Sequence, residues 1–242
     1  MKNTIKKPTF KEIVAVTAMG IPDVGLTFNA QKVGPMKFNG LINADYGKGF
    51  RMPTMPELVP LVYTSLENQE YETAKNVIKT LKNHWLIGNT AIHYFPEGMF
   101  VQDNPEMKNE KIIIPDYKTL ENKLGKYEEK GVVFSDDKSI RFTPYNFKGE
   151  SQSSFELSKN TGIIALVSGE ENSEKLAMAS GHYKINPYFG ALSNVNLPQT
   201  GVAVLFSDGF DFGLVVGAGS SESDCLRCSF GVCEKDAEGV AL

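Results

Sequence analysis

The sequence predicts an α+β fold in which two early helices are followed by many short strands. Two observations carry this prediction. Apolar residues recur at helical spacing over residues 54–66 and again over residues 71–81. From residue 85 onward, short apolar runs alternate with turn-forming residues, as in strands and hairpins. No internal repeat or sharp change of composition divides the 242 residues, so we expect one domain over residues 1–242.

Composition and charge narrow the classes of function. The 25 basic and 29 acidic residues are mixed along the chain and give a net charge of −4, so we expect no nucleic-acid partner. No apolar run approaches the ~20 residues of a membrane span, so we expect no membrane insertion. The first seven residues are polar and basic with no apolar segment behind them. We therefore expect synthesis in the cytoplasm without a signal peptide, with later association with a virion or a cell surface left open.

The first helix has the clearest start in the chain. Thr54 is followed three residues later by Glu57, which predicts a capping box in which each side chain binds a backbone N–H. Pro56 falls in the first turn, where a missing N–H costs nothing. Pro60 lies further along and is expected to tighten or kink the first turns. The second helix carries an apolar stripe and an opposite charged face, as expected of a solvated helix that covers a core.

The remaining elements are shorter. Strands are expected at 13–19, 112–114 and 163–167, and hairpins at 91–95 with 99–101 and at 132–135 with 139–143. We expect turns rather than helix at 20–49 and a short helix at 117–124 that is capped by Asp116. A mobile polar stretch is expected at 150–154 and a charged surface loop at 170–175.

The C-terminal part predicts a rigid hairpin that displays an adaptable loop. An apolar run at 202–206, a Ser-Asp-Gly turn at 207–209 and a second run at 210–215 precede a loop of small and polar residues at 217–224. Phe210 and Phe212 alternate with Asp208 and Asp211, so one pair can face a ligand while the other packs inward. Adaptable polar groups beside rigid aromatic rings are typical of binding surfaces. The alternative interpretation is an ordinary hairpin with a solvated loop.

Two segments resemble a known superfamily. Residues 49–58, GFRMPTMPEL, are similar to the W-R-L-P-T-x-x-E-L segment of C-type-lectin-like modules. Phe50 replaces the aromatic residue, and the matching residues are Arg51, Met52, Pro53, Thr54, Glu57 and Leu58. The hairpin, polar loop and Leu226-Arg227-Cys228 strand are similar to the end of the same modules, in the same order. The W-S-S-type segment that precedes this hairpin in the family is absent, because residues 190–193 read GALS and the only tryptophan is Trp85.

Within that superfamily, the tail most resembles the variable proteins of diversity-generating retroelements. The resemblance implies a C-type-lectin-like fold, an insertion at residues 109–181 and a C-terminal binding or variable region at residues 190–233. It implies a protein or surface glycan as ligand and an Arg227 with a structural role. From the residues themselves we expect no catalytic residue, metal or cofactor, with a calcium requirement left open. The expected ligand-binding residues are Ser193, Asn194, Asn196, Asp208, Phe210, Asp211, Phe212, Ser220, Ser221, Ser223 and Asp224.

Other functions compete with ligand binding. Cys225 and Cys228, with Cys233, could hold a metal or act in redox chemistry, but positions i and i+3 of a strand point to opposite faces, which favours cysteines of the core. An enzyme related to the formylglycine-generating oxidases would need a reactive cysteine pair in a cleft. A structural virion protein is a further alternative. Residues 102–106, QDNPE, could form a calcium loop, although an Asn-Pro turn is the favoured interpretation. The three histidines lie in no catalytic string, and a surface or core place is favoured for each.

Overall fold

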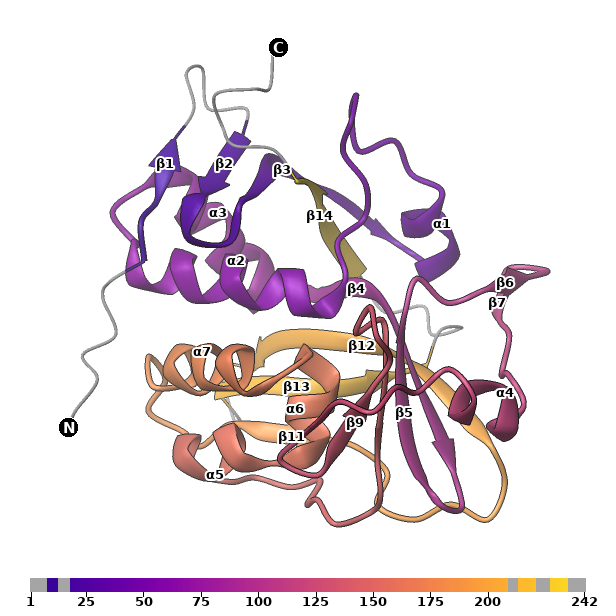
Figure 1. The fold of residues 1–242 in the computed structure, drawn as a ribbon. Coiled ribbons are helices and arrows are strands. Elements are labelled where there is room, and N and C mark those ends of the chain that lie inside the picture. Colours follow the sequence, from indigo (N-terminus) through magenta and orange to yellow (C-terminus); the bar gives the residue numbers. More distant parts are fainter. Residues whose placement is uncertain (1–7, 13–17, 209–212, 221–226, 235–242) are drawn as a thin grey trace.

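A large, mostly antiparallel sheet forms the centre of the computed structural model, which describes residues 8–12, 18–208, 213–220 and 227–234 (Figure 1). The main path of the sheet runs, in order, through β1 (Lys11–Glu12), β2 (Ala18–Ile21), β3 (Leu26–Met36), β14 (Arg227–Cys233), β4 (Trp85–Phe95), β5 (Gly98–Asp103), β10 (Ile140–Thr143), β9 (Val132–Phe134) and β8 (Glu128–Glu129). Most neighbours are antiparallel, whereas β14 and β4 are parallel. The sheet therefore joins the two ends of the chain.

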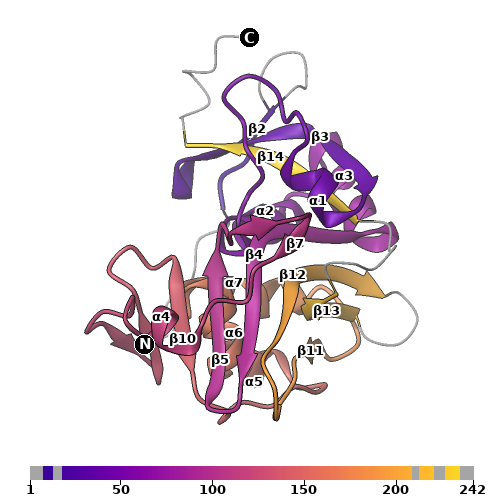
Figure 2. The same ribbon diagram turned by 90° about the vertical axis from the view of Figure 1, so that its right-hand side faces the viewer.

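The C-terminal hairpin branches from β4. Strand β12 (Gln199–Asp208) pairs with β4 on one side and with β13 (Gly213–Gly219) on the other, both antiparallel. Strand β11 (Tyr188–Gly190) then joins β13 in parallel. Figure 2 shows β5, β4, β12 and β13 side by side. The predicted pairing of residues 202–206 with the following strand is confirmed, although β13 already includes Gly217–Gly219, which we expected to lie in the loop.

The long helix α2 (Met55–Glu67) lies at the centre of the helical layer. Its predicted capping box is present: Glu57 Oε2 accepts hydrogen bonds from the Thr54 backbone N at 2.7 Å and from Thr54 Oγ1 at 3.0 Å. Pro60 lies inside the helix and is buried. Helix α2 packs against α3 (Glu72–Asn83) on one side and α7 (Glu170–Ser180) on the other, as Figure 1 shows. The two predicted early helices are thus confirmed, and both pack against the sheet.

Residues 109–181 supply part of this architecture. After the small pair of β6 (Met107–Lys108) and β7 (Lys111–Ile112) come α4 (Tyr117–Glu121), strands β8 to β10, then α5 (Ser154–Lys159), α6 (Thr161–Val167) and α7. The predicted Asp116 cap of α4 is confirmed, since its carboxylate accepts from the Lys118 backbone N at 2.9 Å. The predicted hairpins of β4 with β5 and β9 with β10 are also confirmed. That this segment is an insertion stays a prediction.

The prediction of turns rather than helix at residues 20–49 is wrong. The segment contains the 3-10 turn η1 (Pro22–Val24), the eleven-residue strand β3 and the short helix α1 (Phe38–Ile42). Its glycines do not all mark turns. A Cβ on Gly34 would lie 2.5 Å from the Arg227 carbonyl oxygen, so this glycine allows β14 to approach β3. Pairing with a strand about 200 residues further along the chain stabilises β3, and the local sequence does not reveal this pairing. Of the strand expected at 13–19, residues 18 and 19 belong to β2, and residues 13–17 lie outside the described ranges.

Three further predictions are wrong in the second half of the chain. Residues 163–167 belong to helix α6 instead of a strand, because a continuous apolar run fits either element and the Asn160 side chain caps a helix. Residues 170–175 begin helix α7 instead of a loop, with Glu170 and Glu171 at the favourable N-terminal end. Residues 150–154 are structured, since Ser153 caps α5 and Ser151 pairs with Tyr188.

In the part of the chain that the structure describes, no helix is both long and apolar enough to span a bilayer. Buried apolar side chains from α2, α3, α6, α7 and the inner face of the sheet form one extended core. A smaller apolar cluster packs α1 against the first half of β12 and the start of β4. The C-terminal hairpin is therefore held from both sides by buried side chains.

Candidate binding site

A pocket of about 410 Å³ opens where β11, β12 and β13 meet β4. Its walls come from the end of β11, the start of β12, the end of β13 and one residue of β4. The lining residues are Tyr94, Tyr188, Gly190, Ala191, Leu192, Gln199, Thr200, Gly201, Ala218, Gly219 and Ser220. A volume of this size suits a small ligand or one protruding side chain of a protein.

Glycines bring the strands together beside the pocket. A Cβ on Gly217 would lie 2.2 Å from the Gly190 carbonyl oxygen, so the parallel pairing of β11 with β13 needs a glycine there. A Cβ on Gly219 would lie 2.9 Å from the Trp85 ring. These close approaches fix the backbone on which the exposed side chains stand.

The start of β12 is anchored to β4 through a buried histidine. His93 is fully buried, and burial lowers its pKa to about 4, so the imidazole is neutral at pH 7. Its Nε2 lies 3.3 Å from Gln102 Oε1, and its Nδ1 lies 3.0 Å from the Thr200 hydroxyl. A neutral imidazole has one N–H, so donation from Nε2 to Gln102 leaves Nδ1 as an acceptor. The single proton of the Thr200 hydroxyl is then shared between Nδ1 and the Ile92 carbonyl oxygen, which lies 3.2 Å away.

Two tyrosines line the pocket beside this anchor. Tyr94 is almost fully buried, and burial raises the pKa of its hydroxyl, which therefore stays protonated at neutral pH. Tyr188 of β11 is half-buried. Tyrosine combines a rigid apolar ring with a polar group, a combination that suits contact with proteins and sugars.

The loop between β11 and β12 forms an exposed rim. Ser193, Asn194 and Asn196 are exposed, as are Leu192 at 41% and Leu197 at 73%. Val195, in the middle of this loop, is buried and holds it against the core. Small polar side chains beside exposed leucines give the rim both hydrogen-bonding groups and apolar contact area.

The opposite wall of the pocket ends at Ser220, which is supported from beneath. Arg227 is fully buried, and its guanidinium donates a hydrogen bond to the Ser220 carbonyl oxygen. The same guanidinium lies 5.9 Å from the centre of the Trp85 ring, which stacks on Phe206 at 5.4 Å. Arg227 thus supports the end of β13 from the core, the role that the resemblance implied.

The expected ligand-binding residues do not all meet in one place. Ser193, Asn194 and Asn196 are near the pocket in sequence, and Ser220 lines it. Asp208 pairs with Gly213 at the other end of the hairpin, whereas Val202 pairs with Gly219 at the pocket end. Six residues of strand separate the two ends, roughly 20 Å. Outside the described ranges lie the predicted residues Phe210, Asp211, Phe212, Ser221, Ser223 and Asp224.

Sequence reasoning missed several residues that line the pocket. Tyr94, Tyr188, Gln199 and Thr200 were not among the expected residues, although Gln199 and Thr200 follow the expected Asn196 closely in sequence. Tyr94 and His93 lie opposite Gln199 and Thr200 because of the register of β4 and β12. That register connects segments more than 100 residues apart, and no local signal in the sequence gives it.

The described cysteines lie within the core. Cys228 and Cys233 are both buried on β14 with free thiols, and burial raises the pKa of Cys228. Cys225 falls outside the described ranges. Asp103, in the segment considered for calcium, instead binds the buried Arg141. Among the residues that the structure describes, no three His, Cys, Asp or Glu side chains gather as a metal site would require.

Comparison with known proteins identifies the fold. No protein-family model matches the chain, and no curated protein matches it in sequence. A solved structure from Nanoarchaeota, described as a C-type lectin fold that accommodates massive sequence variation, is similar to the chain with a TM-score of 0.53 and 13% identity. The similarity covers 92% of this chain and 99% of the other.

The protein therefore has a C-type-lectin-like fold of the α+β class, as the two sequence segments predicted. The two segments meet in the structure. Arg51 and Val232 exchange backbone hydrogen bonds of 3.0 and 2.8 Å, so the segment that precedes α2 pairs with the last strand.

Proposed function

We propose that this protein binds a ligand through an exchangeable C-terminal surface, as the variable proteins of diversity-generating retroelements do. The surface consists of the loop between β11 and β12, the pocket beside it and the end of β13. The proposal is supported by Ser220, which is exposed and lines the pocket, and by Ser193, Asn194 and Asn196, which are exposed in the loop that follows the lining residue Leu192. Function is often carried by such loops on a rigid scaffold.

The Nanoarchaeota structure supports the same proposal by analogy of fold. That protein is described as accommodating massive sequence variation. Here the residues that hold the backbone, among them His93, Arg227 and Val195, are buried and distinct from the exposed side chains. Exchanging the exposed side chains would therefore leave the supporting contacts in place.

The proposed ligand is a protein or a surface glycan. Tyr188 and the polar groups of Gln199 and Thr200 could contact either one. The exposed Leu192 and Leu197 add an apolar rim, which suits a protein more than a sugar. We propose binding rather than oxidase chemistry, because the two described cysteines are buried within the core.

The neighbouring DNA tests whether the surface is diversified. We expect a near-identical template repeat of the C-terminal codons beside a reverse-transcriptase gene, with differences confined to template adenines. Coding DNA with no such repeat and no reverse transcriptase nearby would contradict the retroelement part of the proposal, while leaving ligand binding itself to a second test.

A display library tests the binding surface directly. Codons 193, 194, 196 and 220 are randomised, and the library is selected on immobilised lysozyme as a model protein. A matched library randomises four exposed positions that do not line the pocket, Glu121, Asn122, Lys123 and Asp136. We expect specific binders from the first library only. Equal yields from both would show that the proposed surface has no special capacity to bind.

A further inference from the structure

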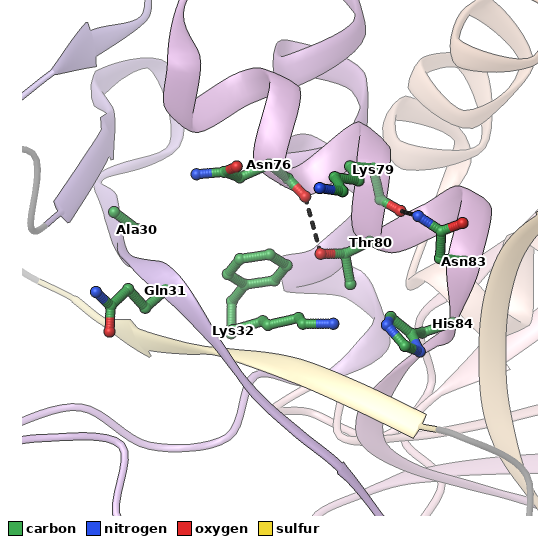
Figure 3. Close-up of a pocket in the computed structure, with 9 residues that line it drawn as sticks. Ala30, Gln31, Lys32, Asn76, Lys79, Thr80, Asn83 and His84 are labelled. Atoms are coloured by element: carbon green, nitrogen blue, oxygen red, sulfur yellow. Dashed lines mark hydrogen bonds between the residues drawn. The ribbon is translucent and has the colours of Figure 1, made fainter.

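A second pocket, of about 430 Å³, lies between β3, the last turns of α3 and β14 (Figure 3). It shares no residue with the pocket of the C-terminal hairpin. Its lining residues are Ala30, Gln31, Lys32, Asn76, Lys79, Thr80, Asn83, His84 and Phe230. The lining contains two lysines, a histidine and three side-chain amides but no carboxylate.

The positive charge of this pocket is not neutralised by the described part of the chain. Neither Lys32 nor Lys79 forms an ion pair with a described residue, whereas Lys75 on the same helix binds Glu72. Lys32 is half-buried, so solvent screens its charge less than that of a surface lysine. Lys79 is exposed, so solvent screens its charge more strongly. Lys32, which comes from β3, is therefore the stronger attractor of an anion.

His84 adds a polar group that the fold leaves unused. Its Nδ1 is buried and has no hydrogen-bond partner among the described residues. Figure 3 shows the Lys32 ammonium extending toward the imidazole. Burial, and then the charge of Lys32, lowers the pKa of His84. The imidazole is therefore predominantly neutral at pH 7, with one N–H that can be donated to a ligand.

The other polar groups are divided between donors and acceptors. Thr80 Oγ1 donates to the Asn76 carbonyl at 2.8 Å, and Asn83 Nδ2 donates to the Lys79 carbonyl at 2.9 Å, which leaves the Asn83 amide oxygen as an acceptor. The side-chain amides of Gln31 and Asn76 offer both kinds of group. Acceptors would be of little use to a bare anion, but they suit the hydroxyl groups of a ligand that also bears an anionic group.

We propose that this pocket binds a compact polyhydroxyl ligand bearing an oxyanion, of the size of one acidic or phosphorylated sugar. The anionic group lies between Lys32, Lys79 and His84, and the hydroxyl groups reach the amides of Gln31, Asn76 and Asn83. The site is separate from the exchangeable surface, so it would be a fixed property of the scaffold.

Calorimetry with four probes tests the chemistry of the ligand: glucuronate, glucose 6-phosphate, neutral glucose and inorganic phosphate. We expect glucuronate or glucose 6-phosphate to bind at least about tenfold more tightly than both glucose and inorganic phosphate. If glucose binds equally well, the oxyanion has no role. If inorganic phosphate binds equally well, the sugar hydroxyl groups have no role. Absence of binding by every probe at about 10 mM would also overturn the proposal.

Matched lysine variants locate the site. Lys32→Gln and Lys79→Gln should each weaken binding of the better probe at least about fivefold, because each removes a charged donor. The control is Lys82→Gln, an exposed lysine on the same helix that does not line the pocket, and it should change affinity less than about twofold. Equal effects of all three substitutions would indicate nonspecific attraction and contradict the proposal.

The imidazole of His84 gives an independent readout. An anion bound beside it favours the protonated form, so saturation with the ligand should raise the pKa of His84 in a histidine NMR titration. His182, which lies 2.7 Å from Glu67 and outside the pocket, is the internal control and should not move. If the pKa of His84 does not change under saturating ligand, the binding site lies elsewhere and the proposal is wrong.

Discussion

The hydroxyl of Thr200 lies 3.0 Å from Nδ1 of the buried His93 and ties the start of β12 to β4. The contact is at the boundary between two regions with different roles. Thr200 lines the candidate pocket, whereas His93 belongs to the core. The position of the pocket wall thus depends on a neutral imidazole that does not itself line the pocket.

This contact predicts a pH dependence of stability. The pKa of His93 is about 4 in the folded protein and 6.5 in its ordinary state, so the unfolded chain binds more protons between these values. The free energy of unfolding therefore keeps its full value above pH 6.5 and decreases as the pH falls toward 4, by about 3 kcal/mol at most. Urea unfolding at pH 7.0, 5.5 and 4.5 measures the loss. A His93→Gln variant should show a flatter profile over this range, and identical profiles would contradict the assignment.

The capping box of α2 predicts that substitution of Glu57 causes a modest loss of stability. Glu57 binds the Thr54 backbone N and forms a two-point ion pair with Arg51 at 2.9 and 2.7 Å. Glu57→Ala should lower the free energy of unfolding by about 1–2 kcal/mol, mostly through the cap, because Ala cannot accept from the Thr54 backbone N and Arg51 is partly exposed. The control is Glu72→Ala, which breaks an exposed ion pair and should change the free energy of unfolding by less than about 0.5 kcal/mol. Equal losses would show that the cap contributes nothing.

The buried ion pair of Asp103 and Arg141 predicts a larger loss of stability when Asp103 is replaced. Arg141 is fully buried and binds both carboxylate oxygens of Asp103, at 2.5 and 3.0 Å. Asp103→Ala leaves this guanidinium buried without its counter-charge and should cost about 3–5 kcal/mol. The double variant Asp103→Leu with Arg141→Met should recover part of the loss in chemical denaturation. A double variant less stable than Asp103→Ala would contradict the proposed cause.

The cysteines are predicted to contribute packing only. Replacing Cys225, Cys228 and Cys233 with Ala should leave ligand selection by the displayed surface unchanged and cost about 1–3 kcal/mol of stability, because buried thiols act as small hydrophobic groups. An oxygen electrode with a thiol substrate compares the two proteins. Oxygen consumption by the wild type that is lost in the folded triple variant would support the oxidase alternative.

Local signals in the sequence predicted the elements that carry their own boundary residues. Thr54 with Glu57 marked α2, and Asp116 marked α4. The apolar run at 163–167 was misassigned because full burial removes the polar positions that distinguish a helix from a strand. Strand β3 was missed because its stability comes from β14, at the other end of the chain.

The candidate site was predicted in part, for a related reason. Ser193, Asn194, Asn196 and Ser220, which the resemblance pointed to, are exposed, as small polar residues of a loop are expected to be. The hairpin turn was grouped with them although it lies at the other end of two extended strands, and sequence adjacency conceals that distance. Tyr94 joins the pocket only through the register of β4 with β12.

Thermal unfolding of a multiply substituted surface variant tests most directly whether the binding surface is exchangeable. The variant combines Ser193→Tyr, Asn194→Arg, Asn196→Tyr and Ser220→Tyr, and its control is the single substitution Val195→Asp in the same loop, where the side chain is buried. Exposed substitutions shift stability by about 0.5 kcal/mol or less each, so the Tm of the fourfold variant should stay within about 8 °C of the wild type. Val195→Asp should lower it further than the fourfold variant does, because it buries a charge. Loss of cooperative unfolding in the fourfold variant would show that these side chains belong to the core and would contradict the proposal of an exchangeable surface.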